Sequence, residues 1–122
     1  MSKVRKMAPY IIGLVVLGTV GAVVLKRSLS SNFAPPEQAH ALVDDGAALI
    51  DVRSPEEFGA GHIEGARNIP VGEIGARAVE VGDKDAPVVV YCRSGIRSAK
   101  AKSALEAAGF TQVHNLGGMS RW

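Results

Sequence analysis

The chain has 122 residues, 47% of them hydrophobic, which is enough for one small domain with an appendage but not for two ordinary domains. It contains a single cysteine, so an internal disulfide is excluded and cysteine usage does not indicate a redox compartment. The formal net charge is +2, but positions 32–122 hold nine basic and twelve acidic residues, a net of −3, which excludes a general nucleic-acid-binding surface.

The N-terminal part of the chain has the pattern of a membrane anchor. Positions 7–25 carry no charge and are rich in Ile, Val and Leu, and a helix of that length spans about 28 Å, close to the hydrocarbon core of a bilayer. Basic residues flank this stretch on both sides, namely Lys3, Arg5 and Lys6 before it and Lys26 and Arg27 after it. We therefore predict a basic tail over residues 1–6, one transmembrane helix over 7–25, a linker over 26–34 and a domain over 35–122.

The same stretch could begin a secretory signal, with Val20-Gly21-Ala22 as its cleavage site. Because hydrophobic residues continue to Leu25, we expect a retained anchor in the inner (cell) membrane instead. The small excess of basic residues before the span favours a domain on the periplasmic side. Gly18 and Ala22 form a small-xxx-small pair, which can promote weak homodimerisation in the bilayer.

The first half of the predicted domain alternates helices with short strands. Ser54-Pro55-Glu56-Glu57 has the form of a capping box, and we expect the helical turn behind it to carry Phe58 into the core. We place His40 on the surface of the preceding helix. The elements predicted in order are a helix from Pro35-Pro36 to Asp44-Asp45-Gly46, a strand over Ala48–Val52, the capped turn, a strand over Arg67–Ile69 and a short helix over Glu73–Val79.

The second half holds the most informative stretch, Val88 to Gly109. Val88–Tyr91 predicts a buried strand that ends at Cys92, and an Ala/Lys-rich helix follows and ends at Gly109. We place Ala99, Leu105 and Ala108 on the apolar face of that helix, and a last strand over Val113–Leu116. Short apolar strands alternating with helices predict an α/β domain of three layers, with a small, mainly parallel sheet covered by helices on both faces.

Cys92 lies at the sheet edge where such folds bind ligands. The loop after it should turn backbone N–H groups inward, and the helix N-terminus adds partial positive charge. Arg93 and Arg97 strengthen this field, so the thiol pKa should fall from about 8.5 towards the range of about 3.5–7.5 found at reactive sites. The pattern favours a reactive thiolate, although a lone cysteine at a strand end is more often an inert buried side chain.

The segment Cys92-Arg93-Ser94-Gly95-Ile96-Arg97-Ser98 resembles the active-site loop of the rhodaneses, which are thiosulfate sulfurtransferases. Between Phe33 and Trp122, several other stretches fit the same family in the same order. They are Leu49-Ile50-Asp51-Val52-Arg53, Glu57-Phe58, the run from Gly61 to Pro70, and the run from Asn115 to Trp122.

The resemblance implies a single-domain rhodanese, and the apolar stretch over residues 7–25 adds a membrane anchor to that expectation. Cys92 would take a sulfur atom from thiosulfate as a persulfide and pass it to cyanide or a thiol. The backbone N–H groups of the loop would stabilise the persulfide anion, and Ser98 would cap the helix and donate to the thiolate. Arg93 and Arg97 would hold the sulfonate end of thiosulfate, or Arg97 would instead brace the loop. These loop residues are Arg93, Ser94, Gly95, Ile96, Arg97 and Ser98.

Three polar residues near this site are assigned structural roles. Asp51 and Arg53 are interpreted as a buried pair that fixes the loop after a strand, which the resemblance also implies. His62 could act as a general base, but a thiolate already made acidic by its loop needs none, so we assign His62 a hydrogen-bonding role. The three histidines have no ligand spacing with Cys92, and we predict neither a metal site nor a cofactor.

Two other functions remain open at this point. A cysteine phosphatase or arsenate reductase is disfavoured because the loop from Cys92 to Arg97 has six residues, one fewer than the phosphatase loop. A non-catalytic rhodanese-like module that binds a partner at the membrane is the other, although such modules usually lack the cysteine that is present here.

Overall fold

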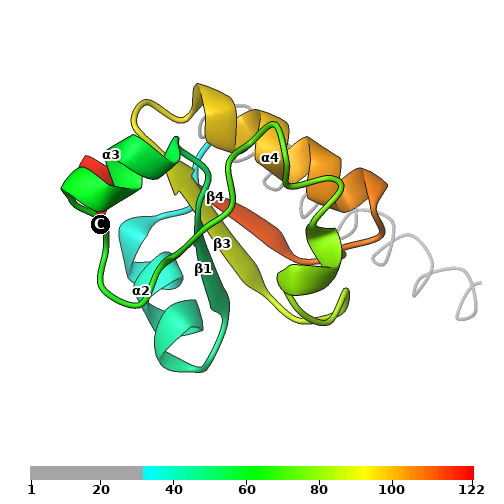
Figure 1. Ribbon diagram of the computed structural model, residues 1–122. Coiled ribbons are helices and arrows are strands. Elements are labelled where there is room, and N and C mark those ends of the chain that lie inside the picture. The colour runs from blue at the N-terminus through cyan, green and yellow to red at the C-terminus, as the bar shows by residue number, and fades with distance from the viewer. Residues whose placement is uncertain (1–31) are drawn as a thin grey trace, which may run out of the picture. The chain divides into compact units, whose positions relative to one another are not determined.

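The structure is a computed structural model that describes residues 32–122 (Figure 1). The predicted tail (1–6), membrane helix (7–25) and most of the linker (26–34) lie outside the described residues. Within residues 32–122, the helices lack the length and apolar character that a bilayer crossing requires. The compact unit begins at Phe33, so the last two residues assigned to the linker belong to it.

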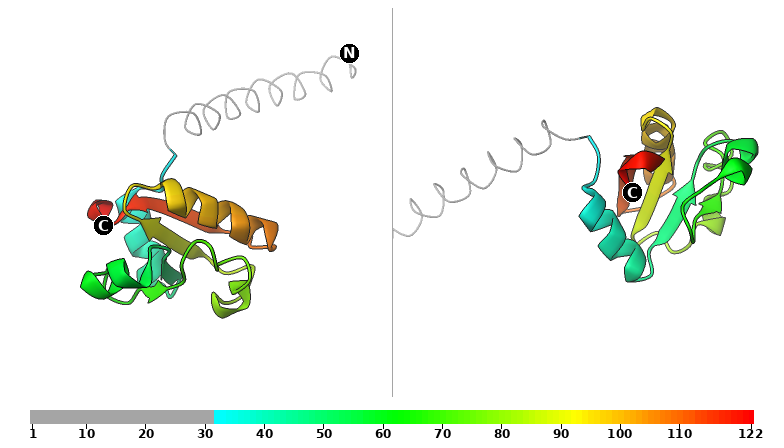
Figure 2. Two further views of the ribbon diagram at one scale, coloured as in Figure 1. Left: turned by 45° about the horizontal axis from the view of Figure 1, so that its top comes forward. Right: turned by 90° about the vertical axis from the view of Figure 1, so that its left-hand side faces the viewer.

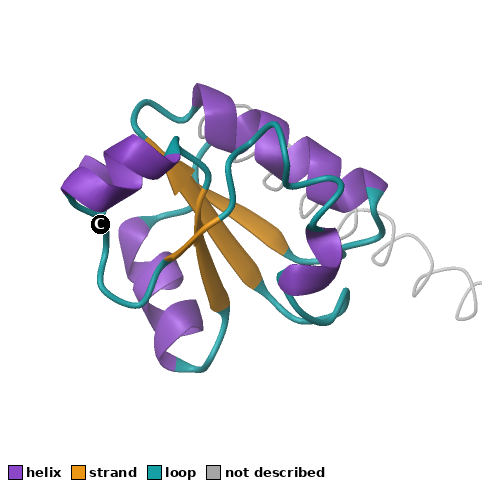
Figure 3. Ribbon diagram, in the orientation of Figure 1, coloured by secondary structure: helices purple, strands orange, loops and turns teal. Residues whose placement is uncertain are grey.

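The described residues form a parallel α/β domain with the strand order β2-β1-β3-β4, which confirms the predicted parallel sheet flanked by helices (Figure 3). The strands are β1 (Ala48–Asp51), β2 (Arg67–Asn68), β3 (Val88–Cys92) and β4 (Val113–Gly118). The helices are α2 (Pro36–Asp44), α3 (Pro55–Ala60) and α4 (Ile96–Ala107), with 3₁₀ turns η1 (Ala78–Glu80) and η2 (Met119–Arg121).

The central strand β3 is buried over its whole length and serves two apolar clusters. Because successive side chains of a strand point to opposite faces, Val88, Val90 and Cys92 pack on the side of α4, whereas Val89 and Tyr91 pack on the side of α2. The two helices therefore cover opposite faces of the sheet (Figure 2), and the domain has the three predicted layers.

Local sequence signals explain where the elements begin and end. Ser54 accepts from the Glu57 backbone N–H while the Glu57 side chain accepts from the Ser54 backbone N–H, so the predicted capping box starts α3. Gly109 follows α4 at a φ of +103°, a conformation that glycine adopts without steric cost.

The predicted helix over Glu73–Val79 is wrong. Residues 71–77 form turns, and only the short η1 follows them. Gly72 and Gly75 fall in this stretch, and a glycine inside a helix costs about 1 kcal/mol relative to alanine. Ile74 is fully buried, and Val71 and Ala78 pack partly buried against the same cluster, so the turns place these apolar side chains in the core without a regular helix.

Three side-chain placements are also corrected. Phe58 does not enter the core but is half-buried and stacks on His62, with 3.7 Å between ring centroids. His40 is partly buried because its ring stacks on Trp122 and its Nε2 lies 2.8 Å from the Trp122 carbonyl oxygen. Ala99 is exposed, since the buried face of α4 consists of Ser98, Ala101 and Leu105, which are spaced at helical intervals.

Candidate active site

Cys92 is the last residue of β3, and its side chain is fully buried. The chain then turns through Arg93 and Ser94 to Gly95, the residue that caps the N-terminus of α4. The Gly95 backbone N–H donates to the Cys92 sulfur at 2.9 Å, and the Ser98 hydroxyl lies 3.4 Å from the same sulfur. The loop therefore surrounds the thiol with hydrogen-bond donors, as the sequence predicts.

Two opposing influences act on the thiol. Burial by itself raises the pKa of Cys92, but the Ser98 hydroxyl and the backbone N–H groups of Ser98, Gly95 and Ser94 together hold that pKa below its ordinary value. Hydrogen bonds of this kind favour the charged form of an acid. These hydrogen bonds therefore stabilise the thiolate form of a sulfur whose side chain is fully buried.

Glycines let the loop approach the neighbouring strand. Gly95 has a φ of +100°, which a residue with a Cβ rarely adopts. In β4, a register shift after Asn115 pairs Gly117 with Tyr91 and Gly118 with Cys92. A Cβ on Gly118 would overlap the carbonyl oxygen of Arg93, so the glycine end of β4 makes the space that this loop occupies.

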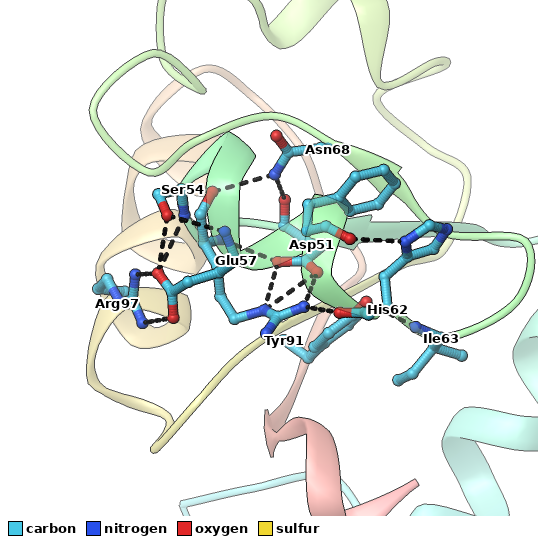
Figure 4. Close-up of polar contacts among 11 residues, drawn as sticks. Asp51, Ser54, Glu57, His62, Ile63, Asn68, Tyr91 and Arg97 are labelled. Atoms are coloured by element: carbon cyan, nitrogen blue, oxygen red, sulfur yellow. Dashed lines mark hydrogen bonds and ion pairs between the residues drawn. The ribbon is translucent and has the colours of Figure 1, made fainter.

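Arg97 braces the loop. Its Nη1 and Nη2 donate to the Glu57 carboxylate at 2.6 and 3.0 Å, a bidentate ion pair between the first turns of α4 and α3 (Figure 4). Arg97 and the Ser54 backbone hold the pKa of Glu57 at about 2. Of the two roles considered for Arg97, the bracing role is the one that fits this contact.

Arg93, the residue that follows Cys92, is exposed. It lines an open hollow of about 480 Å³ together with residues of α3, its flanking loops and η2, namely Arg53, Glu57, Ala60, Gly61, Met119 and Ser120. Ser94 is exposed beside it, and the Ile96 side chain is 67% exposed. An anion entering this hollow would meet the guanidinium of Arg93, the residue next to Cys92 in the chain.

Asp51 and Arg53 form the predicted buried pair. The Arg53 Nη2 donates to the Asp51 carboxylate at 2.7 Å and to the Gly61 carbonyl oxygen at 2.7 Å (Figure 4). The Asn68 side chain donates to the carbonyl oxygens of Asp51 and Arg53. These bonds fix the loop between β1 and α3, and so the position of Glu57 at the start of that helix.

His62 has a local hydrogen bond, as assigned from the sequence. Its Nδ1 lies 2.9 Å from the Phe58 carbonyl oxygen, and its ring stacks on Phe58. The side chain is exposed, and its hydrogen-bond partner is the Phe58 backbone and not Cys92. Its position fits the structural role.

The helix-capping role predicted for Ser98 is wrong. The cap is Gly95, and Ser98 is the third residue of the helix, so its hydroxyl points back to the Cys92 sulfur instead. Sequence reasoning also missed the contact of Glu57 with Arg97. The available signal was that α3 and the Cys92 loop follow adjacent parallel strands, β1 and β3, whose carboxyl ends meet at one sheet edge.

In the part of the chain that the structure describes, His, Cys, Asp and Glu side chains form no group of three that could hold a metal ion. The arrangement around Cys92 instead supplies a buried thiol, several N–H donors and a nearby cation. These groups suit nucleophilic chemistry on an anion through a covalent cysteine intermediate.

Comparisons with known proteins agree with this arrangement. The family model described as "Rhodanese-like domain" matches residues 35–122. The chain is 47% identical over 77 residues to the uncharacterized protein YqhL of Bacillus subtilis, covering 62% of this chain and 60% of that protein. It is 40% identical over 89 residues to the thiosulfate sulfurtransferase GlpE of Pseudomonas fluorescens, covering 72% of this chain and 81% of that one.

Among solved structures, a rhodanese with anions from E. coli matches with a TM-score of 0.60 and 42% identity, covering 63% of this chain and 92% of that chain. The matched family model extends over most of the sequence, and the fold agrees with that of the solved rhodanese. The chain therefore belongs to the rhodanese-like domain family.

Proposed function

We propose that the protein is a sulfurtransferase that moves a sulfane sulfur through a persulfide on Cys92. The thiolate attacks the outer sulfur of thiosulfate, a new S–S bond forms, and the old S–S bond breaks. Sulfite leaves with the electron pair of that bond. Cyanide or a thiolate then attacks the outer sulfur of the persulfide, and the Cys92 thiolate leaves unchanged for the next cycle.

The observation that carries this proposal is the set of donors around the Cys92 sulfur, with the Gly95 N–H at 2.9 Å and the Ser98 hydroxyl at 3.4 Å. Such donors stabilise a negative charge on sulfur before and after attack. We assign Arg93 to hold the sulfonate end of thiosulfate in the hollow that its side chain lines. Arg97 forms an ion pair with Glu57 and therefore acts as a positioning residue for the Cys92 loop.

The test is mass spectrometry of the chain before and after thiosulfate alone. We expect one added sulfur atom on Cys92, sulfite in the medium, and ping-pong kinetics when cyanide is added. Cys92→Ser should lose nearly all transfer. Undiminished transfer in that variant would end the proposal, and phosphate release from a phosphomonoester would favour the phosphatase alternative.

We also propose that residues 7–25 anchor the domain in the inner membrane, with the domain on the periplasmic side. The uncharged apolar stretch and its basic flanks support this. The chain should stay in the membrane fraction after an alkaline wash, and Leu17→Arg should release it. Protease added to spheroplasts should digest the domain; a protected domain would reverse the orientation.

A further inference from the structure

The segment that leads into the domain touches the loop that holds the thiol. We infer that Phe33 is a positioning residue for the Cys92 thiolate, because its ring supports the loop from behind at Gly95. The expected effect of Phe33 on sulfur transfer rests on the proposed function. The expected effect of Phe33 on the ionisation of the Cys92 thiol does not, and it can be measured without knowing the natural substrate.

The Phe33 ring occupies the space beside two glycines. A Cβ built on Gly95 would lie 2.5 Å from the Phe33 Cζ and 2.6 Å from its Cε1. A Cβ built on Gly117 would lie 3.1 Å from the Phe33 Cγ and Cδ2. The ring therefore packs directly on the backbone of the loop and on the backbone of β4, where side chains would otherwise exclude it.

Phe33 is itself held in place by the chain around it. The next residue, Ala34, donates its N–H to the Asn115 carbonyl oxygen at 2.7 Å and accepts from the Arg121 Nη2 at 3.2 Å. The Arg121 guanidinium lies over the Phe33 ring, 5.2 Å from its centroid, and the Arg121 Nε donates to the Leu116 carbonyl oxygen at 2.7 Å. The ring therefore has a fixed position relative to β4.

Gly95 links the position of the Phe33 ring to the thiol through a hydrogen bond. Its N–H is the donor 2.9 Å from the Cys92 sulfur, and Asn115 adds a long 3.5 Å hydrogen bond from its side chain to the Gly95 carbonyl oxygen. Without the ring, a void would open behind Gly95, and the peptide could turn away from the sulfur. The thiolate would then lose part of its stabilisation and its reactivity.

The experiment measures the rate at which iodoacetamide alkylates Cys92 in the full chain as a function of pH. In Phe33→Ala, the rate below the thiol pKa should fall about fivefold, the equivalent of one ordinary hydrogen bond of about 1 kcal/mol. At high pH the two rates should converge, because the thiol is then ionised in both proteins. The alkylation rate of Phe33→Leu below the thiol pKa should lie between the rates of Phe33→Ala and of the unmodified chain.

Phe110→Ala is the matched control. Phe110 is a buried core residue just beyond the far end of α4, so its truncation should lower the melting temperature and leave the pH profile of alkylation unchanged. An unchanged profile in Phe33→Ala and Phe33→Leu would overturn the inference, as would an equal shift in Phe110→Ala. If the chain fails to transfer sulfur while the Phe33 variants still shift the profile, the proposed function fails and the positioning role stands.

Discussion

At Cys92, a fully buried sulfur has a pKa below its ordinary value. Desolvation alone would keep the thiol neutral, so the charged form depends on the donors that reach it. Only one of those donors is a side chain, the Ser98 hydroxyl, and the others are backbone N–H groups. A single substitution at Ser98 can therefore test how far the hydrogen-bond donors offset desolvation of the thiolate, and it leaves the backbone unchanged.

Ser98→Ala should raise the pKa of Cys92, because it removes a donor that stabilises the thiolate and leaves burial unchanged. Thiolate-dependent rates fall as the pH drops through the pKa, so the acid limb of the rate profile should move to higher pH. A hydrogen bond to a charged group contributes roughly 1.5–3 kcal/mol, so alkylation below the pKa should slow by about tenfold or more. Stopped-flow alkylation and sulfur transfer across pH would measure this.

Ser103→Ala on the exposed side of the same helix provides the control, since it makes the same chemical change away from the thiol. Its profile should match that of the unmodified chain. If Ser98→Ala also matched, the hydroxyl would have no part in holding the charge, and the backbone donors would have to account for all of it.

At the scale of elements, α3 and α4 are joined through Glu57. One carboxylate closes the capping box of α3 with Ser54 and takes both Nη atoms of Arg97 on α4. The two helices begin after adjacent parallel strands, so this ion pair fixes the two loops relative to each other at the edge where Cys92 lies. Losing the charge on Glu57 would loosen both the cap and the brace.

Glu57→Gln should remove an acid-dependent part of the stability. The pKa of Glu57 is about 2 in the folded chain, below its ordinary value of 4.5. The contribution of the ionised carboxylate to the free energy of unfolding is therefore fully present above pH 4.5 and is lost as the pH falls towards 2. The melting temperature of the unmodified chain should therefore decrease more steeply across that window than that of Glu57→Gln. Thermal melts at closely spaced pH values would show it.

Glu56→Gln is the matched control, because Glu56 is an exposed acid in the same helical turn. It should retain the steep decrease between pH 4.5 and pH 2. Parallel curves for the unmodified chain and Glu57→Gln would contradict the coupling of α3 to the loop.

The elements also show what the sequence could predict. Signals confined to a few neighbouring residues were confirmed: the capping box at Ser54, the buried strand before Cys92 and the turn at Gly109. The helix predicted over Glu73–Val79 failed because the prediction left out the cost of Gly75 inside it and of Gly72 just before it. The contacts of Glu57 with Arg97 and of Phe33 with Gly95 were missed because they join distant parts of the chain, and only the sheet topology brings those parts together.

At the scale of the whole domain, two apolar clusters lie on opposite faces of one sheet. The α4 side includes Cys92 and Leu105, and the α2 side includes Tyr91 and Leu116, with Trp122 packed against it. The strand β3 contributes alternate side chains to both clusters. If the packing on one face were lost, β3 would be exposed on that side, and the cluster on the other face would lose the support of the same strand. This predicts that the domain unfolds as one cooperative unit.

Leu105→Ala and Leu116→Ala test that prediction from the two sides. Both leucines are fully buried, so each truncation should lower the free energy of unfolding by about 2–5 kcal/mol, whereas Val79→Ala, at a side chain 89% exposed, should change it by less than about 0.5 kcal/mol. Urea unfolding would be followed by far-UV circular dichroism and by Trp122 fluorescence, which reports on the α2 side. In a single cooperative unit, Leu105→Ala shifts the fluorescence midpoint as far as the dichroism midpoint, although Trp122 lies on the opposite face. A dichroism midpoint that moves while the fluorescence midpoint stays would show that the two faces unfold separately, and the donors around Cys92 would then depend on the stability of the α4 side alone.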